Sequence, residues 1–132
     1  MSEKFDFATP EYIAFGEKFL QEAVAQRASE FADFKYTFGE IFTGVPEHLA
    51  KDGRLSWQMI YDNGRVSWKP GIPEHADKRV EMPYQMALSI CHLTTAEIAK
   101  KFPQMMEGAT AIPRLVLEAG SVLHDRMIPF TR

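Results

Sequence analysis

The sequence predicts an α+β domain in which an antiparallel or mixed sheet of four to five strands is covered by helices. Two patterns in the 132-residue chain lead to this fold class. Apolar residues recur three and four positions apart near both ends, which is typical of amphipathic helices, and at every second position between residues 34 and 82, which is typical of half-buried strands. Because the strands follow one another instead of alternating with helices, we expect the helices to gather on one face of the sheet.

Length and composition fit a single domain spanning residues 1–132. A domain of this size buries about two-thirds of the surface of its unfolded chain, so it can hold a core and a cavity without metal or disulfides. The formal net charge of −3 gives no basic excess, so we expect no nucleic-acid partner. No apolar run is long enough for a signal peptide or a membrane span, so we expect no integral membrane contact. The single cysteine, Cys91, favours a reducing compartment, with the cytoplasm as the default.

The first predicted element is a helix that begins after Thr9. The Thr9 hydroxyl can cap the helix, Pro10 suits the first helical position, and Glu11 places a carboxylate at the positive end of the helix dipole. The apolar residues that follow share one stripe, which we expect to pack on the sheet. They are Tyr12, Phe15, Phe19, Leu20, Ala23 and Val24.

Alternation of apolar and polar residues predicts the strands. The first strand begins at Phe34 and continues through Phe42, and a second carries its large apolar residues from Leu55 to Tyr61 on one face. A short Pro46–Ala50 turn of helix separates them. A fourth strand, residues 78–82, follows the loop that begins at Pro70.

A hairpin turn at Asn63-Gly64 leads from the second strand into the third. This dipeptide is the strongest short hairpin signal. A two-residue loop there pairs Tyr61 with Val66 and Met59 with Trp68, so large apolar residues meet across the ladder. The register of the hairpin is therefore a specific prediction.

Helices are predicted for the second half of the chain. Thr94 and Glu97 have the spacing of a capping box, which begins a helix that runs to about Phe102, and Pro103 then ends or bends it. A further helix is expected over residues 113–126. Helical spacing also appears in one apolar set before the capping box, and the last helix carries a second set inward. These sets are Met86, Ala87, Ile90 and Cys91, then Leu115, Ala119, Val122 and Leu123.

Histidines are the starting point for any acid–base chemistry. Adjacent residues on a helix point about 100° apart, so Cys91 and His92 make a poor catalytic dyad. His124 and Asp125, which end the last helix, are candidate catalytic residues, with His92 as another. The alternative is that His124 and Arg126 cap the last carbonyls while Asp125 pairs with a neighbour.

Motifs for cofactors and metals are absent. The chain has no GxGxxG or P-loop sequence, no HExxH or GxSxG sequence, and no Cys/His spacing typical of a metal site. We therefore expect no cofactor and no bound metal.

The apolar residues favour a ligand pocket. Most aromatic residues precede Lys69 and most of the seven methionines follow it, and a flexible methionine layer over an aromatic sheet can enclose a hydrophobic cavity. The alternative is that both groups simply fill a core. The predicted ligand-binding residues are Trp57, Met59, Trp68, Met86, Ile90, Phe102, Met105 and Met106.

The order of elements resembles the sterol carrier protein family of lipid-binding domains. The segments that carry the likeness are Phe38–Pro46, Asp62–Val66 and Ala76–Tyr84, and the likeness covers roughly residues 10 to 130. It implies a curved sheet covered by helices around an apolar tunnel for fatty acyl chains, sterols or related molecules, with no cofactor and no covalent chemistry. Family members usually add a final strand, whereas residues 107–112 show no clear alternation.

Three functions follow as hypotheses. The first is a small carrier that holds an apolar molecule or lipid in a cavity, and we favour it because no histidine has a partner at an activating spacing. The second is a small cofactor-independent enzyme, an isomerase, dehydratase or hydrolase, that acts on a hydrophobic substrate in the same cavity. The third is an interaction module with an exposed methionine-rich patch. The oligomeric state does not follow from the sequence.

Overall fold

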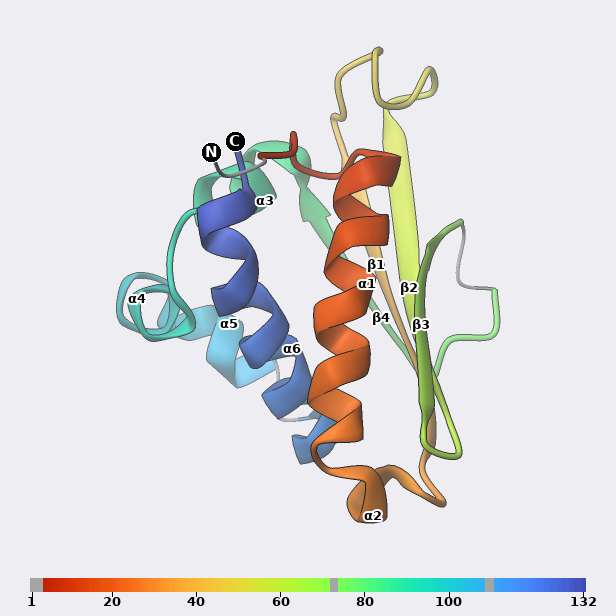
Figure 1. The fold of residues 1–132 in the computed structure, drawn as a ribbon. Coiled ribbons are helices and arrows are strands. Elements are labelled where there is room, and N and C mark those ends of the chain that lie inside the picture. Colours follow the sequence, from red (N-terminus) through yellow and green to blue (C-terminus); the bar gives the residue numbers. More distant parts are fainter. Residues whose placement is uncertain (1–3, 72–73, 109–110) are drawn as a thin grey trace.

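A computed structural model gives the structure of the protein over residues 4–71, 74–108 and 111–132, with side chains described for all of these except residues 106–108. Helices cover one face of an open, mixed sheet, and within the described residues this sheet has four strands (Figure 1). The predicted α+β class is confirmed. Within the same residues, no helix combines the length and the apolar character needed to cross a membrane.

The sheet has the strand order β3-β2-β1-β4. Strand β1 lies at the centre and pairs antiparallel with β2 and parallel with β4, while β2 and β3 form an antiparallel hairpin. Helix α3 follows β4 directly in the chain. The strands are β1 (Lys35–Thr43), β2 (Arg54–Asp62), β3 (Arg65–Pro70) and β4 (Lys78–Pro83).

The hairpin between β2 and β3 has the predicted register. Tyr61 pairs with Val66, and Met59 pairs with Trp68. Asn63 and Gly64 both have positive φ, at 51° and 87°, as a two-residue turn matched to the strand twist requires. The large apolar residues therefore meet on the face that the helices cover.

Helix α1 (Pro10–Ala25) begins as predicted and packs on β3. The Thr9 hydroxyl accepts a hydrogen bond from the Tyr12 amide at 3.3 Å. Gly16 faces the Trp68 ring so closely that a Cβ at this position would collide with it. The Glu17 carboxylate accepts a hydrogen bond from the backbone amide of Trp68 at 3.0 Å, which satisfies an amide of the edge strand.

The remaining helices are short, apart from the last one. The predicted capping box of α4 is confirmed, because the Thr94 side chain accepts from the Glu97 amide and the Glu97 side chain accepts from the Thr94 amide. Pro103 ends α4 and also begins a helix that the pattern did not predict. The N–H of the first helical residue has no partner within the helix, so a proline in that position loses no hydrogen bond. The helices are α2 (Ala28–Phe31), α3 (Tyr84–Ile90), α4 (Thr95–Lys101), α5 (Pro103–Gly108) and α6 (Arg114–Met127), followed by a 3₁₀ turn at Ile128–Phe130.

The inward face of α6 differs by one position from the predicted one. Val122 was expected to face inward, but 44% of its surface is exposed, so this prediction is wrong. Leu115 is half-buried, whereas the residues that α6 buries repeat three and four positions apart and form one stripe. They are Val116, Ala119, Leu123 and Met127.

Candidate functional site: an apolar cavity between sheet and helices

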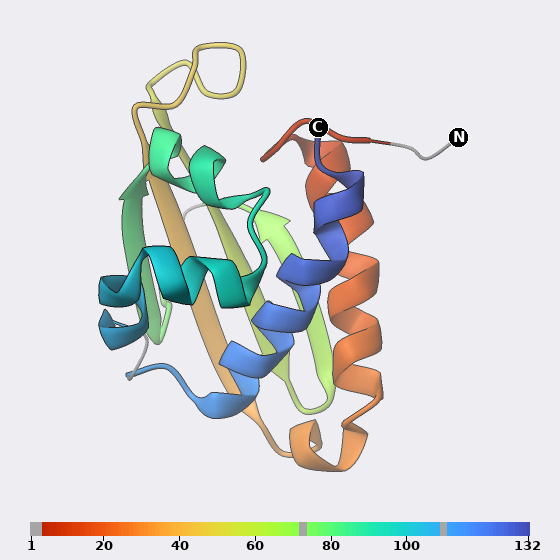
Figure 2. The same cartoon turned by 90° about the vertical axis from the view of Figure 1, so that its left-hand side faces the viewer.

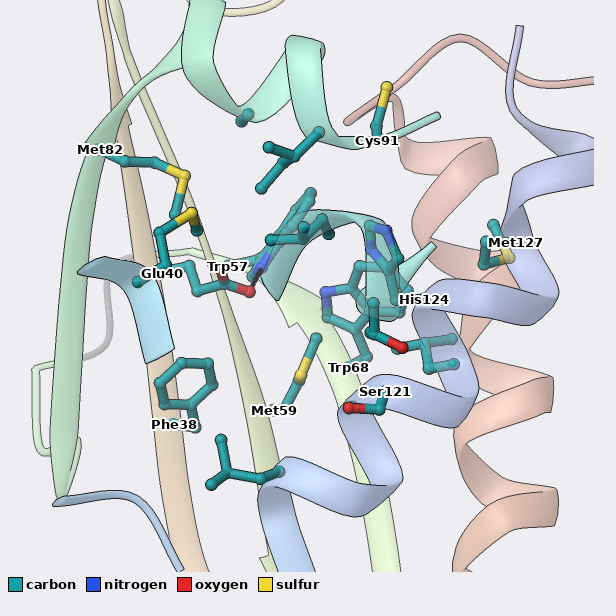
Figure 3. A pocket seen from close by; sticks show the side chains of 18 of the residues that line it. Phe38, Glu40, Trp57, Met59, Trp68, Met82, Cys91, Ser121, His124 and Met127 are labelled. Atoms are coloured by element: carbon teal, nitrogen blue, oxygen red, sulfur yellow. Dashed lines mark hydrogen bonds between the residues drawn. The ribbon is translucent and has the colours of Figure 1, made fainter. Parts of the chain in front are cut away.

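A cavity of about 290 Å³ lies between the covered face of the sheet and the helical layer (Figure 3). Figure 2 shows this layer from the front, with α3, α4 and α5 beside the diagonal α6. Because neighbouring residues in the ladders share a face, all four strands contribute inward side chains to the cavity wall. On the sheet side these are Phe38, Glu40, Phe42, Trp57, Met59, Trp68 and Met82.

The helical wall is almost entirely apolar. Helix α6 contributes the most residues to this wall, and α3, α4 and α5 contribute fewer. Its lining residues include Ala87, Ile90, Cys91, Ile98, Met105, Val116, Leu117, Leu123 and Met127. Polar side chains line the cavity at only a few described positions, and these are the residues that could form hydrogen bonds or exchange protons with a ligand.

The structure brings together five of the eight predicted ligand-binding residues. Trp57, Met59, Trp68, Ile90 and Met105 all line the cavity. Two of the other three, Met86 and Phe102, lie outside the lining. Met86 is 38% exposed and lies outside the lining, because its neighbour on α3, Ala87, holds the inward position; Phe102 is half-buried and outside the lining; and the side chain of Met106 lies outside the described part of the structure.

Glu40 is the acidic residue of the cavity, and the sequence reasoning missed it. Its Oε1 accepts a hydrogen bond from Nε1 of Trp57, its partner across the β1–β2 ladder, at 2.9 Å. Burial raises the pKa of the Glu40 carboxyl, and the hydrogen bond from Trp57 offsets part of that rise. One signal was available, since Glu40 stands two positions from both Phe38 and Phe42 and so shares their face.

Trp68 adds a buried donor to the same wall. Only 4% of its surface is exposed, and its indole Nε1 has no hydrogen-bond partner in the described part of the structure. The Trp68 and Trp57 rings meet edge to face with centroids 5.0 Å apart. Leaving a buried N–H unpaired costs free energy, so a ligand atom that accepted a hydrogen bond from Nε1 would stabilise the complex.

His124 lines the cavity, but its predicted partner does not accompany it. The His124 Nε2 lies 2.6 Å from the Leu93 carbonyl oxygen, and because a carbonyl only accepts, Nε2 carries the proton in this contact. Asp125 instead accepts from the amide and the hydroxyl of Thr95, each at 2.8 Å. Asp125 therefore joins α6 to the start of α4 and does not orient His124.

The alternative role of His124 and Arg126, capping the last carbonyls of α6, is not seen among the described contacts. His124 bonds a carbonyl outside α6, as described above. Arg126 forms an ion pair with Glu22 at 2.6 Å and lies 4.2 Å from the centre of the Phe19 ring. Both residues thus connect α6 to other elements.

Cys91 and His92 directly follow the end of α3, where Cys91 is buried and His92 is exposed. The thiol is buried, it donates to the Leu88 carbonyl at 3.1 Å, and burial raises its pKa to about 11. His92 is exposed and does not line the cavity. Little thiolate is present near neutral pH, so this pair is poorly suited to nucleophilic catalysis.

Comparisons with known proteins add nothing to this description. No family model matches the chain, and no curated protein or solved structure matches it. Across the described ranges, no three His, Cys, Asp or Glu side chains are grouped so that they could hold a metal ion. The apolar cavity, with Glu40, Trp68 and His124 in its wall, is therefore the candidate site.

Proposed function

We propose that the protein binds a small, largely apolar molecule in the cavity and carries it without changing it. The observation that supports this function is the cavity itself, about 290 Å³ in volume and lined by aromatic, aliphatic and methionine side chains. Protein interiors are normally close-packed, and voids weaken the contacts of the atoms around them. The volume lies just below the usual range for ligand pockets, about 300–1,000 Å³, so a compact ligand would restore those contacts.

The ligand class is a fatty acyl chain, a sterol or a similar lipid. A wall of this composition offers dispersion contacts along its whole length and few polar groups, which suits an acyl chain or a fused ring system. The proposed likeness to sterol carrier proteins has the same support: helices on one face of a mixed sheet and an apolar cavity between the two layers. A location in a reducing compartment such as the cytoplasm completes the proposal, and the buried thiol of Cys91 is consistent with it.

The test uses a fluorescent fatty acid, cis-parinaric acid, and a fluorescent sterol, dehydroergosterol. Trp57 and Trp68 both lie in the cavity wall, so a bound probe should quench their emission by energy transfer in a saturable way. A bound probe should also be displaced by the matching non-fluorescent lipid. If neither probe gives a saturable signal, the proposed function is wrong.

Gly120 offers a variant that fills the cavity without disturbing the backbone. This residue of α6 lines the cavity, and a Cβ placed on it would meet no atom within 4 Å. Gly120→Leu should therefore fold, because leucine also favours a helix more than glycine does, and it should abolish probe binding. Val122→Leu, on the exposed side of the same helix, is the matched control and should bind as the unmodified protein does.

A second candidate function is catalysis on a hydrophobic substrate in the same cavity. It is favoured by one observation: Glu40 and His124, two groups capable of acid–base chemistry, both line the cavity. The discriminating experiment incubates the protein with its bound lipid and compares the lipid by mass spectrometry before and after. A product that disappears in His124→Gln or Glu40→Gln while lipid affinity is retained would replace carriage by catalysis.

A further inference from the structure

We propose that Glu40 and Trp68 together form a polar recognition point that binds a hydroxyl group on an otherwise apolar ligand. This inference rests on the proposed carrier function and narrows it to alcohols such as sterols or fatty alcohols. It adds a specific contact to a cavity whose other walls give only apolar packing.

The two polar atoms belong to one cluster of side chains. Glu40 bonds the Trp57 indole through Oε1, and within the described residues no further hydrogen bond to the Glu40 side chain is found. The Trp57 ring in turn packs edge to face on the Trp68 ring. Figure 3 shows the Glu40 carboxyl group and the Trp68 indole turned toward the same space. The cluster thus presents an acceptor and a donor to one cavity.

A hydroxyl group is the ligand chemistry that satisfies both atoms. Its oxygen can accept from Nε1 of Trp68, which has no partner among the described residues, while its hydrogen is donated to the carboxyl group of Glu40. A hydrocarbon would leave the buried indole N–H unpaired, and an ammonium group offers it no lone pair. A ligand carboxylate would bring a charge into an apolar cavity beside another carboxyl group, and the loss of its hydration is unfavourable.

Other polar side chains of the cavity are already engaged or lie on the helical wall. The His124 Nε2 is bonded to Leu93, and the Thr95 hydroxyl donates to Asp125. Ser121 lies on α6, in the wall opposite the sheet.

The experiment compares ligands that share a ten-carbon chain and differ in the head group. The probes are decanol, decyl methyl ether, decylamine and decanoic acid, each measured by isothermal titration calorimetry. The ether can accept from Trp68 but cannot donate to Glu40, so its affinity reports the apolar contacts plus one hydrogen bond. We expect decanol to bind about tenfold more tightly than the ether and the other two probes, as one added hydrogen bond in an apolar cavity allows.

Variants then assign the contact to its residues. Glu40→Gln should remove most of the preference for decanol over the ether, because the amide oxygen can keep the hydrogen bond from Trp57 while the NH2 group, a donor, replaces the free acceptor. Trp68→Phe should weaken both ligands and leave the ratio between them nearly unchanged. Val122→Ala, on the exposed side of α6 and outside the lining, should change neither affinity. Unchanged binding of the ether to Glu40→Gln shows that the cavity is intact in that variant.

Each outcome decides one proposal. If decanol and the ether bind equally well to the unmodified protein, the recognition point is wrong and the carrier function stands. If decanoic acid or decylamine binds most tightly, the head group is of another class and the inference is again overturned. If none of the four binds and the fluorescent lipids also fail, the carrier function falls with it.

Discussion

The covered face of the sheet has two halves that are packed in different ways. Over β3, the 16-residue helix α1 lies close to the strand, and Leu20 on this helix is fully buried. Over β1 and β4, the covering helices α3 and α4 have seven residues each, and a cavity remains beneath the helical layer. One face of one sheet thus carries both a close-packed core and a void.

The difference shows what sets the local packing density. Gly16 has no side chain where α1 meets Trp68, so helix and ring approach closely, whereas flexible methionines and short helices meet the other half. Trp68 belongs to both halves, because it faces Gly16 and also lines the cavity. The Trp68 indole therefore separates the close-packed core from the candidate site.

The strongest test of this comparison truncates one side chain in each half. Leu20→Ala should lower the free energy of unfolding by about 2–5 kcal/mol, because it opens a hole in close-packed surroundings. Met82→Ala, at the wall of the existing cavity, should cost less than about 2 kcal/mol, since that side chain has contacts on fewer sides. Urea unfolding followed by circular dichroism measures both. Equal losses would show that the halves are packed alike.

Gly16→Ala tests how closely α1 approaches the Trp68 ring. The new methyl group would overlap the Trp68 ring, and overpacking of this kind costs about 1–3 kcal/mol, partly offset by the better helix propensity of alanine. We also expect the tryptophan emission to shift as Trp68 moves toward the cavity. Gly120→Ala is the matched control, because its methyl group meets no atom within 4 Å and should stabilise the helix. A neutral Gly16→Ala variant would contradict the close approach.

Thr94→Ala should lower the free energy of unfolding by a smaller amount, and its structural effect should be confined to α4, which forms part of the helical wall of the cavity. The substitution removes the side-chain half of the capping box of α4, for which losses of about 1 kcal/mol are typical. Hydrogen exchange should become faster in α4 but not in α1. Thr94→Ser keeps the hydroxyl group and should retain the protection of α4; if it exchanges as fast as the alanine variant, the cap is not the cause.

The smallest effect is a change in how stability depends on pH. Burial raises the pKa of Glu40 above its ordinary value of 4.5, so the folded protein keeps this proton at a higher pH than the unfolded chain does. The contribution of Glu40 to stability is therefore full below about pH 4.5 and is lost as the pH rises through the folded pKa. Glu40→Gln should remove this loss and become relatively more stable toward neutral pH.

The difference between the two unfolding curves, measured from about pH 4 to pH 8, isolates Glu40. The pKa values of Glu97 and Glu118 are lowered by their hydrogen bonds and ion pairs, so their contributions have the opposite sign and are common to both proteins. A constant difference across this range would mean that Glu40 is not desolvated in the folded state.

Local signals in the sequence predicted much of the fold. The Asn63-Gly64 turn fixes a two-residue loop, and a slip of one residue would turn the apolar face outward, so the hairpin register followed from the pattern. The starts of α1 and α4 followed from their capping residues. These features depend on contacts between residues that are close in the chain.

Some of the features that escaped prediction depend on contacts that are distant in the chain. Periodicity does not say which neighbour a strand takes or in which direction, so the parallel pairing of β4 with β1 could not be read from it. Helix α5 was missed because Pro103 can end one helix and begin the next. Five of the predicted ligand-binding residues line the cavity, but Met86 does not, since apolar spacing alone does not decide which edge of a helical stripe faces a void.

The parallel ladder between β1 and β4 has a consequence for the order of folding. Its paired residues lie about forty positions apart in the chain, whereas the β2–β3 hairpin joins near neighbours, so closing the ladder costs more chain entropy. We expect the hairpin to form early and β4, with the attached α3, to dock late. The same edge should open first under native conditions, with amides of β4 exchanging faster than those of β2. Because Met82 and Ile90 come from these two elements, such an opening would uncover the cavity while the rest of the sheet stays folded.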